Sequence, residues 1–119
     1  MTRTIMNKQQ VAAFCLSLPG VQQDIKWGGV EVFFVDQSKM FALFNLNAEG
    51  LSFKVEKELF LGYIDRPGIR PSPYLARAYW INMQAPYPMG AEELQDLLRR
   101  SHQLVVSKLP KKRQTGLLI

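Results

Sequence analysis

The sequence is poor in the residue types that usually carry metal, redox and nucleophilic chemistry. Its 119 residues include one cysteine, Cys15, and one histidine, His102. A lone cysteine cannot close a disulfide within the chain, which favours a reducing compartment and predicts a cytoplasmic protein. A lone histidine cannot form a metal-binding cluster, and the first expected helix, residues 7–18, contains no acidic residue. We therefore expect no metal site and no cofactor.

Long apolar runs and catalytic motifs are also missing. No apolar run approaches the roughly 20 residues that cross a bilayer, and the first residues lack the apolar stretch of a secretory signal, so we expect no membrane association. There is no glycine-rich phosphate loop and no Cys-x-x-Cys pair. The sequence therefore favours a protein that is not an enzyme.

The three residues with reactive side chains all have a plainer interpretation. Cys15 lies on an apolar helical stripe, which predicts a buried, inert thiol. Ser101 has no partner base in the sequence pattern, so we expect its hydroxyl to donate to the carbonyl of Leu97. His102 follows Ser101 on the polar flank of the last helix, where a structural or solvated imidazole is expected.

The composition is that of a folded domain, with 47% hydrophobic and 21% charged residues. A chain of this length forms a single core that buries about two-thirds of its unfolded surface. We expect one domain over residues 1–110, followed by a basic and then apolar tail at 111–119. The expected elements are a helix at 7–18, strands at 31–35, 40–46 and 51–55, a short helix at 56–63, a strand at 78–83 and a helix from 91 to Pro110.

The first helix has clear signals at both ends. Asn7 and Gln10 have the spacing of a capping box, and Pro19-Gly20 stops the helix. Between them, apolar residues recur at helical spacing in a single stripe: Val11, Phe14, Cys15 and Leu18.

The strand signals predict an antiparallel sheet. The three strands after residue 30 are joined by short turns, which leave no room for the crossover that parallel pairing needs. The 40–46 strand is apolar on both faces, so it is expected to be central and covered on each side. Residues 65–73 hold three prolines and predict an irregular loop. In the 78–83 strand, Tyr79, Ile81 and Met83 should share one face, with Trp80 and Asn82 on the other.

Together these elements predict a two-layer α+β domain, in which an antiparallel sheet is packed by the N-terminal and C-terminal helices in the order α-β-β-β-α-β-α. In the last helix, the negative charges of Glu92 and Glu93 fall in the first turn, where they interact favourably with the helix dipole. Leucines recur along this helix at helical spacing.

The chain resembles the MmcQ/YjbR family of small bacterial proteins over nearly its whole length. The resemblance is carried by a series of short segments in order: Leu18-Pro19-Gly20, 24–28, Lys39-Met40-Phe41-Ala42-Leu43, Phe53-Lys54-Val55-Glu56, 71–80, Ser101-His102-Gln103-Leu104-Val105 and Lys108-Leu109-Pro110. It implies a fold like that of the bacterial frataxin homologue and of secretion chaperones, and a DNA-binding role. One departure is Ala76-Arg77-Ala78-Tyr79-Trp80, where family members often have Asn-Lys-x-His-Trp. The frataxin-like iron site does not carry over, because the first helix lacks carboxylates.

The charge distribution is the strongest functional signal. Residues 1–98 carry nine basic and ten acidic residues, whereas residues 99–119 carry six basic residues and no acidic one. A near-neutral body with one cationic end favours polyanionic partners. We therefore expect DNA binding through phosphate contacts. The predicted contacts are Lys108, Lys111, Lys112 and Arg113, aided by Arg99 and Arg100, with Arg70 and Arg77 as further cations and Tyr74, Trp80 and Trp27 as stacking residues.

Other interpretations of the same features remain open. Basic residues near the end of a helix also stabilise its dipole, and a large aromatic residue is more often part of a core. Apolar material at 69–74 and 86–89 is compatible with a groove for a protein partner, and the 116–119 tail with docking in cis or in trans. A small-molecule pocket between the sheet and the helices is a third possibility.

Overall fold

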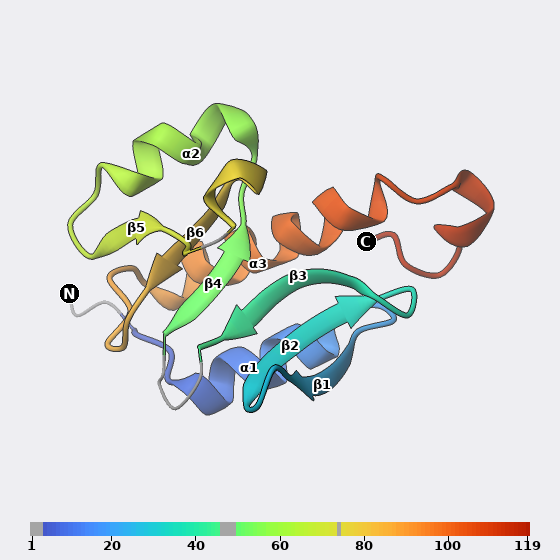
Figure 1. Cartoon of the computed structure of the whole chain (residues 1–119), viewed down its shortest axis with the longest axis horizontal. Coiled ribbons are helices and arrows are strands. Elements are labelled where there is room, and N and C mark those ends of the chain that lie inside the picture. Colours follow the sequence, from blue (N-terminus) through green and yellow to red (C-terminus); the bar gives the residue numbers. More distant parts are fainter. Residues whose placement is uncertain (1–3, 46–49, 74) are drawn as a thin grey trace.

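The computed structural model describes residues 4–45, 50–73 and 75–119, which form a sheet covered by helices (Figure 1). The helices are α1 (Lys8–Ser17), α2 (Lys57–Ile64) and α3 (Ala91–Val106), and two short 3₁₀ turns are η1 (Ala76–Ala78) and η2 (Lys111–Arg113). The strands are β1 (Gln22–Lys26), β2 (Val30–Val35), β3 (Lys39–Phe44), β4 (Leu51–Lys54), β5 (Ile69–Pro71) and β6 (Trp80–Met83). The predicted α+β class is confirmed.

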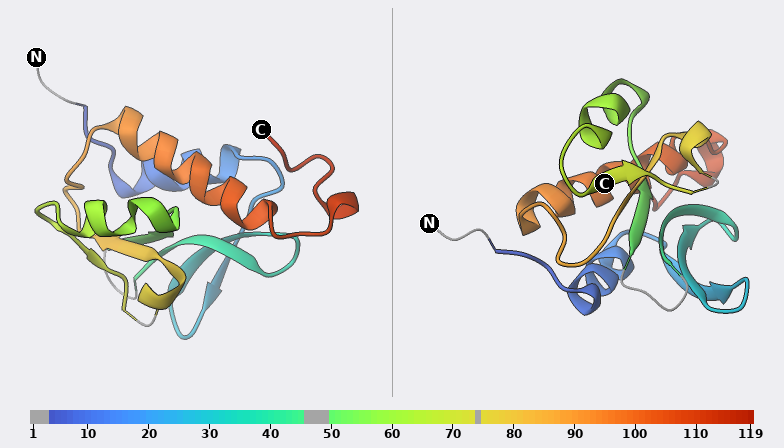
Figure 2. Two further views of the ribbon diagram at one scale, coloured as in Figure 1. Left: turned by 90° about the horizontal axis from the view of Figure 1, so that it is seen from above. Right: turned by 60° about the vertical axis from the view of Figure 1, so that its left-hand side comes forward.

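All neighbouring strands in the sheet are antiparallel, in the order β1-β2-β3-β4-β6-β5. This arrangement leaves β1 and β5 at the two edges and β3 in the interior, as expected for the strand that is apolar on both faces. The three helices lie together on one face of the sheet (Figure 2, left).

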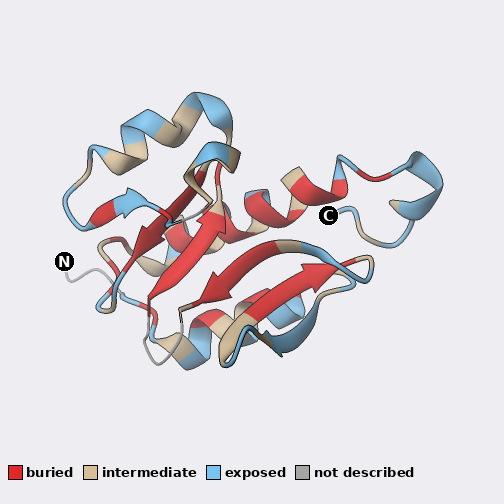
Figure 3. Cartoon of the chain, viewed as in Figure 1, coloured by how far each residue is buried: buried red, intermediate tan, exposed pale blue. Residues whose placement is uncertain are grey.

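The main core lies between the sheet and these helices. Figure 3 shows that β2, β3, β4, β6 and the inner face of α3 are buried, whereas β1 and the C-terminal segment are exposed. Phe33 and Phe44 meet edge to face inside this core, with ring centroids 5.8 Å apart. Its largest fully buried side chains include Phe33, Phe41, Phe44, Phe53, Leu94 and Leu98.

A second, smaller cluster lies on the opposite face of the sheet, which carries none of the three α-helices. It contains the buried side chains of Val32, Phe34, Leu43 and Trp80, and partly buried residues beside η1 pack against it. Because β3 contributes to both clusters, it is covered on each side.

The helix signals in the sequence match the observed ends. The backbone N–H of Gln10 donates to Asn7 Oδ1 at 2.8 Å, and the backbone N–H of Asn7 donates to Gln10 Oε1 at 2.9 Å. This reciprocal pair is the predicted capping box, and it satisfies two donors that a helix end would otherwise leave free. Glu92 and Glu93 lie in the first turn of α3, as expected.

The structure corrects three details of the predicted elements. Gln22–Lys26 forms an additional strand, β1, before the first predicted one. Within the segment predicted to be irregular, Ile69–Pro71 forms the edge strand β5, where a proline is tolerated because its missing N–H faces no neighbour. Tyr79 is not a strand residue: its φ of 64° is left-handed, so β6 begins at Trp80.

Candidate functional site

The C-terminal segment folds back against the turn between β2 and β3. Arg113 Nη2 lies 2.6 Å from Asp36 Oδ2, and Arg113 Nε donates to Asp36 Oδ1 at 3.3 Å. Leu109 is only 5% exposed, and Leu117 packs against the main core. Gln103 Nε2 also donates to the carbonyl of Leu117 at 3.0 Å. Leu117 of the apolar tail therefore docks in cis, whereas Leu118 and Ile119 are exposed, and the segment is held to the body at several points.

This docking brings four exposed lysines to one end of the molecule. Lys108 follows α3, Lys111 and Lys112 lie in η2, and Lys39 begins β3 beside the turn that holds Asp36. All four are exposed, and none forms an ion pair with a described residue. We call Lys39, Lys108, Lys111 and Lys112 the lysine end; it lies at the right of Figure 1. Sequence reasoning missed Lys39, because only the contact between Arg113 and Asp36 joins it to the others.

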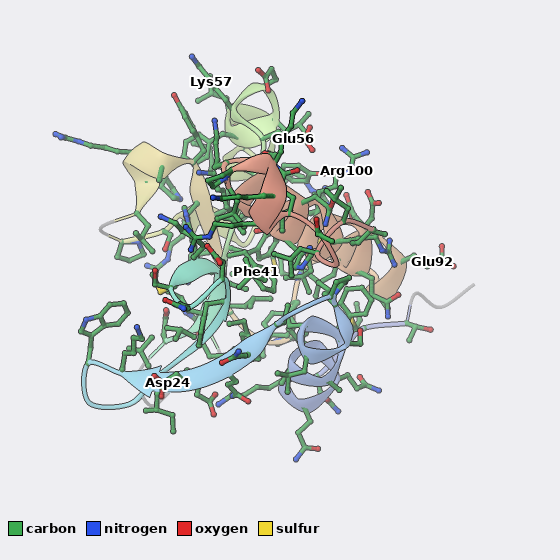
Figure 4. The ribbon with its side chains drawn as sticks, turned by 90° about the vertical axis from the view of Figure 1, so that its right-hand side faces the viewer. Asp24, Phe41, Glu56, Lys57, Glu92 and Arg100 are labelled. Carbon is green, nitrogen blue, oxygen red and sulfur yellow. The ribbon has the colours of Figure 1, made fainter. Side chains whose placement is uncertain are left out.

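Three of the predicted phosphate contacts are already paired with carboxylates. Arg113 pairs with Asp36, as above. Arg99 Nη1 lies 3.9 Å from Asp96, and Arg100 contacts Asp96 at 3.1 Å and Glu56 at 3.2 Å. Figure 4 shows Arg100 beside Glu56, between α3 and α2. The Asp96 carboxylate, followed by Glu56, raises the pKa of Arg100 above its ordinary value.

The remaining predicted cations lie elsewhere. Arg70 is on β5, where its Nε donates to Asn82 Oδ1 at 2.9 Å, and Arg77 is exposed on η1. Both elements are separated from η2 along the long axis of the molecule (Figure 1). Tyr74, the predicted stacking residue between them, lies outside the described residues.

The two tryptophans have opposite environments. Trp80 is 4% exposed and packs in the small cluster, so its ring has no free face for a base. Trp27 is 65% exposed in the turn between β1 and β2, so it is the tryptophan with an available ring.

Trp27 also borders an apolar pocket on the helix-free face of the sheet. The pocket has a volume of about 480 Å³, and its wall is almost entirely apolar, with Asn45 and Ser72 as the polar side chains. Its lining residues are Trp27, Val30, Met40, Leu43, Asn45, Ser72, Pro73 and Leu75. The pocket is therefore suited to an apolar group and offers few hydrogen-bonding partners.

In the apolar segment at 86–89, expected to form a groove for a partner, alternate residues belong to the core, whereas Pro86 is exposed and lines a pocket with Ile5 and Met6. Tyr87 and Met89 are fully buried, and Ile69 from the other expected groove segment is buried as well. Ser72 and Pro73, from this second segment, line the pocket beside Trp27, so the pocket is an apolar surface that a partner could contact.

The residues with reactive side chains are buried inside the fold. Cys15 is inaccessible, and burial raises the pKa of its thiol to about 12, as expected for an inert thiol. Ser101 does not donate to Leu97: its hydroxyl donates to the carbonyl of Phe41 at 2.8 Å and accepts from the backbone N–H of Lys54 at 3.1 Å. Its role is therefore to join two strands.

His102 is also buried, and not on the polar flank that the sequence predicted. Its Nε2 donates to the carbonyl of Pro19 at 2.8 Å, its Nδ1 accepts from Gln103 Nε2 at 2.8 Å, and the ring meets Phe41 edge to face. Burial lowers the pKa of the imidazole, against a smaller raising effect of the Pro19 hydrogen bond. The ring is therefore a neutral structural group.

Within the residues that the structure describes, no three His, Cys, Asp or Glu side chains gather in a way that could hold a metal ion. In the same set, no helix is long and apolar enough to cross a membrane.

Fold and site define a small α+β domain with a six-stranded antiparallel sheet in its described part and one lysine-rich end. The family model described as YjbR matches residues 16–104, so the chain belongs to the YjbR family, which confirms the resemblance seen in the sequence.

The solved structures similar to this one include two bacterial proteins. A Deinococcus radiodurans protein with the family-model domain DUF419 has a TM-score of 0.85 at 26% identity, covering 97% of this chain and 91% of its own. A Pseudomonas syringae protein has a TM-score of 0.70 at 27% identity, covering 84% of this chain and 99% of its own. A search of curated proteins finds no match.

Proposed function

We propose that this chain is a non-catalytic domain that binds DNA through phosphate contacts of the lysine end. The observation that carries the proposal is the gathering of Lys39, Lys108, Lys111 and Lys112 at one end, exposed and without carboxylate partners among the described residues. Residues 97–119 contain no acidic side chain that would repel a phosphate.

The ion pairs divide the predicted phosphate contacts into arginines that are paired with carboxylates and lysines that are not. Phosphate must displace a carboxylate before it can bind Arg99, Arg100 or Arg113, whereas the four lysines are free to exchange bound counterions for phosphate. Contacts of this kind position a protein on DNA without reading its sequence. We therefore expect weak or no sequence preference.

A salt titration tests the proposal. If four lysines engage phosphates, the logarithm of the binding constant should fall with the logarithm of salt concentration at a slope of about −3 to −4, with a Kd of roughly 10⁻⁴–10⁻⁶ M. Fluorescence anisotropy with labelled single-stranded and duplex DNA measures both. Absence of binding to either form at low ionic strength would eliminate the proposal.

A double substitution locates the contact. Lys111→Ala with Lys112→Ala should reduce the slope by about two, because each lost phosphate contact removes roughly one unit. Lys57→Ala is the matched control, since Lys57 is also an exposed lysine but lies on α2, away from η2 (Figure 1). An unchanged slope in the double variant would place the contact on another surface.

A second candidate function, a protein-interaction domain, is favoured by the apolar pocket beside Trp27. A half-open apolar pocket with an exposed indole at its rim suits an apolar side chain of a protein partner. Affinity capture at high salt, with wild type and Trp27→Ala, discriminates the two functions. A partner that persists in high salt and is lost from the variant supports this function, whereas material released by salt or nuclease supports nucleic acid.

Under either proposed function, we expect the protein to be located in the cytoplasm. The support is the lone Cys15, whose buried thiol has no partner for a disulfide within the chain. A reporter fusion that changes signal between reducing and oxidising compartments tests this location.

A further inference from the structure

The strand β1 is an edge of the sheet that carries one exposed apolar side chain and is followed by a second. Only β2 pairs with it, and four of its five residues are exposed. Ile25 is 65% exposed within the strand, and Trp27 follows directly after it with the same exposed fraction. Exposed edge strands pair readily with another strand, and natural proteins usually protect them.

The free backbone groups of β1 belong to alternate residues. The N–H of Ile25 donates to the side-chain Oδ1 of its neighbour Asp24 at 2.8 Å, so it does not point toward β2. Because backbone groups alternate in direction along an antiparallel strand, Gln23 and Ile25 present their N–H and C=O groups to the free edge. An incoming antiparallel strand can therefore pair with this edge only if its own residues with free N–H and C=O groups lie opposite Gln23 and Ile25.

If the incoming strand is β1 of a second copy, few registers satisfy this condition. A two-fold axis at Asp24 sets Asp24 against itself, and an axis at Lys26 sets Lys26 against itself, so both bring like charges together. An axis at Gln23 leaves Asp24 opposite Gln22. An axis at Ile25 instead sets Asp24 of each copy opposite Lys26 of the other, and Ile25 opposite Ile25.

We propose that two copies of this chain associate through β1, antiparallel and centred on Ile25, so that two six-stranded sheets become continuous. The two reciprocal Asp24–Lys26 pairs make the strand complementary to itself, which a two-fold symmetric interface requires. The Asp24 carboxylate, which covers the N–H of Ile25 in the single chain, exchanges that bond for Lys26 of the second copy.

The contacts of this dimer lie on both faces of the sheet. Lys26 lies over the ring of Phe34, 5.9 Å from its centroid, so the charge pairs belong to the helix-free face. Ile25 points to the opposite face, because side chains alternate along a strand. One short strand buries little area, so the dimer is weak and depends on protein concentration. It uses no residue of the lysine end, so it is independent of the proposed DNA binding.

Sedimentation velocity from micromolar to millimolar protein concentration is the first test. We expect the weight-average sedimentation coefficient to rise with concentration toward the value for a dimer. A coefficient that stays at the monomer value throughout would overturn the proposal.

Charge reversal tests the register. Asp24→Lys sets lysine against lysine, and Lys26→Asp sets aspartate against aspartate, so each variant alone should raise the dimer Kd at least about tenfold. An equimolar mixture of the two variants restores opposite charges at both pairs and should recover the wild-type Kd.

Two variants control for the change in net charge. Glu58→Lys and Lys57→Glu make the same charge changes on exposed residues of α2, far from Asp24 (Figure 4), and should leave the Kd unchanged. The proposed register, and with it the interface, would be overturned if both β1 variants dimerise with the wild-type Kd. The same holds if the mixture dimerises as weakly as each variant alone.

Discussion

At the scale of single residues, Ser101 holds the sheet together where two strands separate. The ladder between β3 and β4 ends at the pair Ala42 and Phe53, and the next pair in register is Phe41 and Lys54. The hydroxyl of Ser101, from α3, donates to the carbonyl of Phe41 and accepts from the N–H of Lys54. The side chain thus replaces a backbone pair with two hydrogen bonds of its own.

This arrangement predicts a large effect of a small substitution. Ser101→Ala should lower the free energy of unfolding by about 1–3 kcal/mol, because it leaves the buried carbonyl of Phe41 and the partly buried N–H of Lys54 without their partner. Urea unfolding followed by circular dichroism measures the change. Ser107→Ala is the control: its hydroxyl donates to the carbonyl of Leu104 in an exposed position, so a loss within about 0.5 kcal/mol is expected. Equal losses in the two variants would contradict the bridging role.

At the scale of elements, the sequence predicts those whose pattern is determined locally. The helix α1 has a capping box at its start and a stop signal at its end, and β3 is apolar from Met40 to Phe44, so both were predictable. The strand β1 was not, because Gln22–Lys26 is mostly polar and exposed and its strand state depends on pairing with β2. The strand β5 was not predictable either, because its strand state depends on pairing with β6. Only this pairing places Pro71 where a missing N–H is tolerated.

The candidate site likewise has one part that the sequence predicts and one part that only the fold reveals. A count of charges along the chain is sufficient to find Lys108, Lys111 and Lys112. It cannot reveal that Arg113 is paired with Asp36, or that this pairing adds Lys39, because those residues are more than 70 positions apart in sequence. Long-range ion pairs therefore decide which predicted cations are free, and only the fold supplies them.

At the scale of the whole molecule, one imidazole joins the two ends of the chain. His102 lies on α3, donates to the carbonyl of Pro19 in the connection from α1 to β1, and accepts from Gln103, which also donates to the carbonyl of Leu117. In the same region, Leu117 packs so closely on Gly20, whose φ is +71°, that a Cβ there would lie 2.2 Å from Leu117 Cδ2. The first helix, the last helix and the tail thus meet around a neutral ring.

This position makes the stability of the whole domain depend on pH. Burial lowers the pKa of His102 in the folded state below the ordinary 6.5, so at mildly acidic pH the unfolded chain binds a proton that the folded chain resists. The free energy of unfolding should therefore be constant above pH 6.5 and decrease as the pH falls from 6.5 toward the folded-state pKa. One proton contributes a slope of at most about 1.4 kcal/mol per pH unit.

Urea unfolding between pH 7.5 and about pH 5, above the range in which ordinary carboxylates titrate, measures this dependence. His102→Gln keeps a side chain that can donate to the carbonyl of Pro19 but has no proton to bind. Because His102 is the sole histidine of the chain, this variant should show a nearly flat profile over the same range, whatever its absolute stability. A wild-type profile that is equally flat would show that the imidazole is protonated inside the fold, contrary to its neutral role between Pro19 and Gln103.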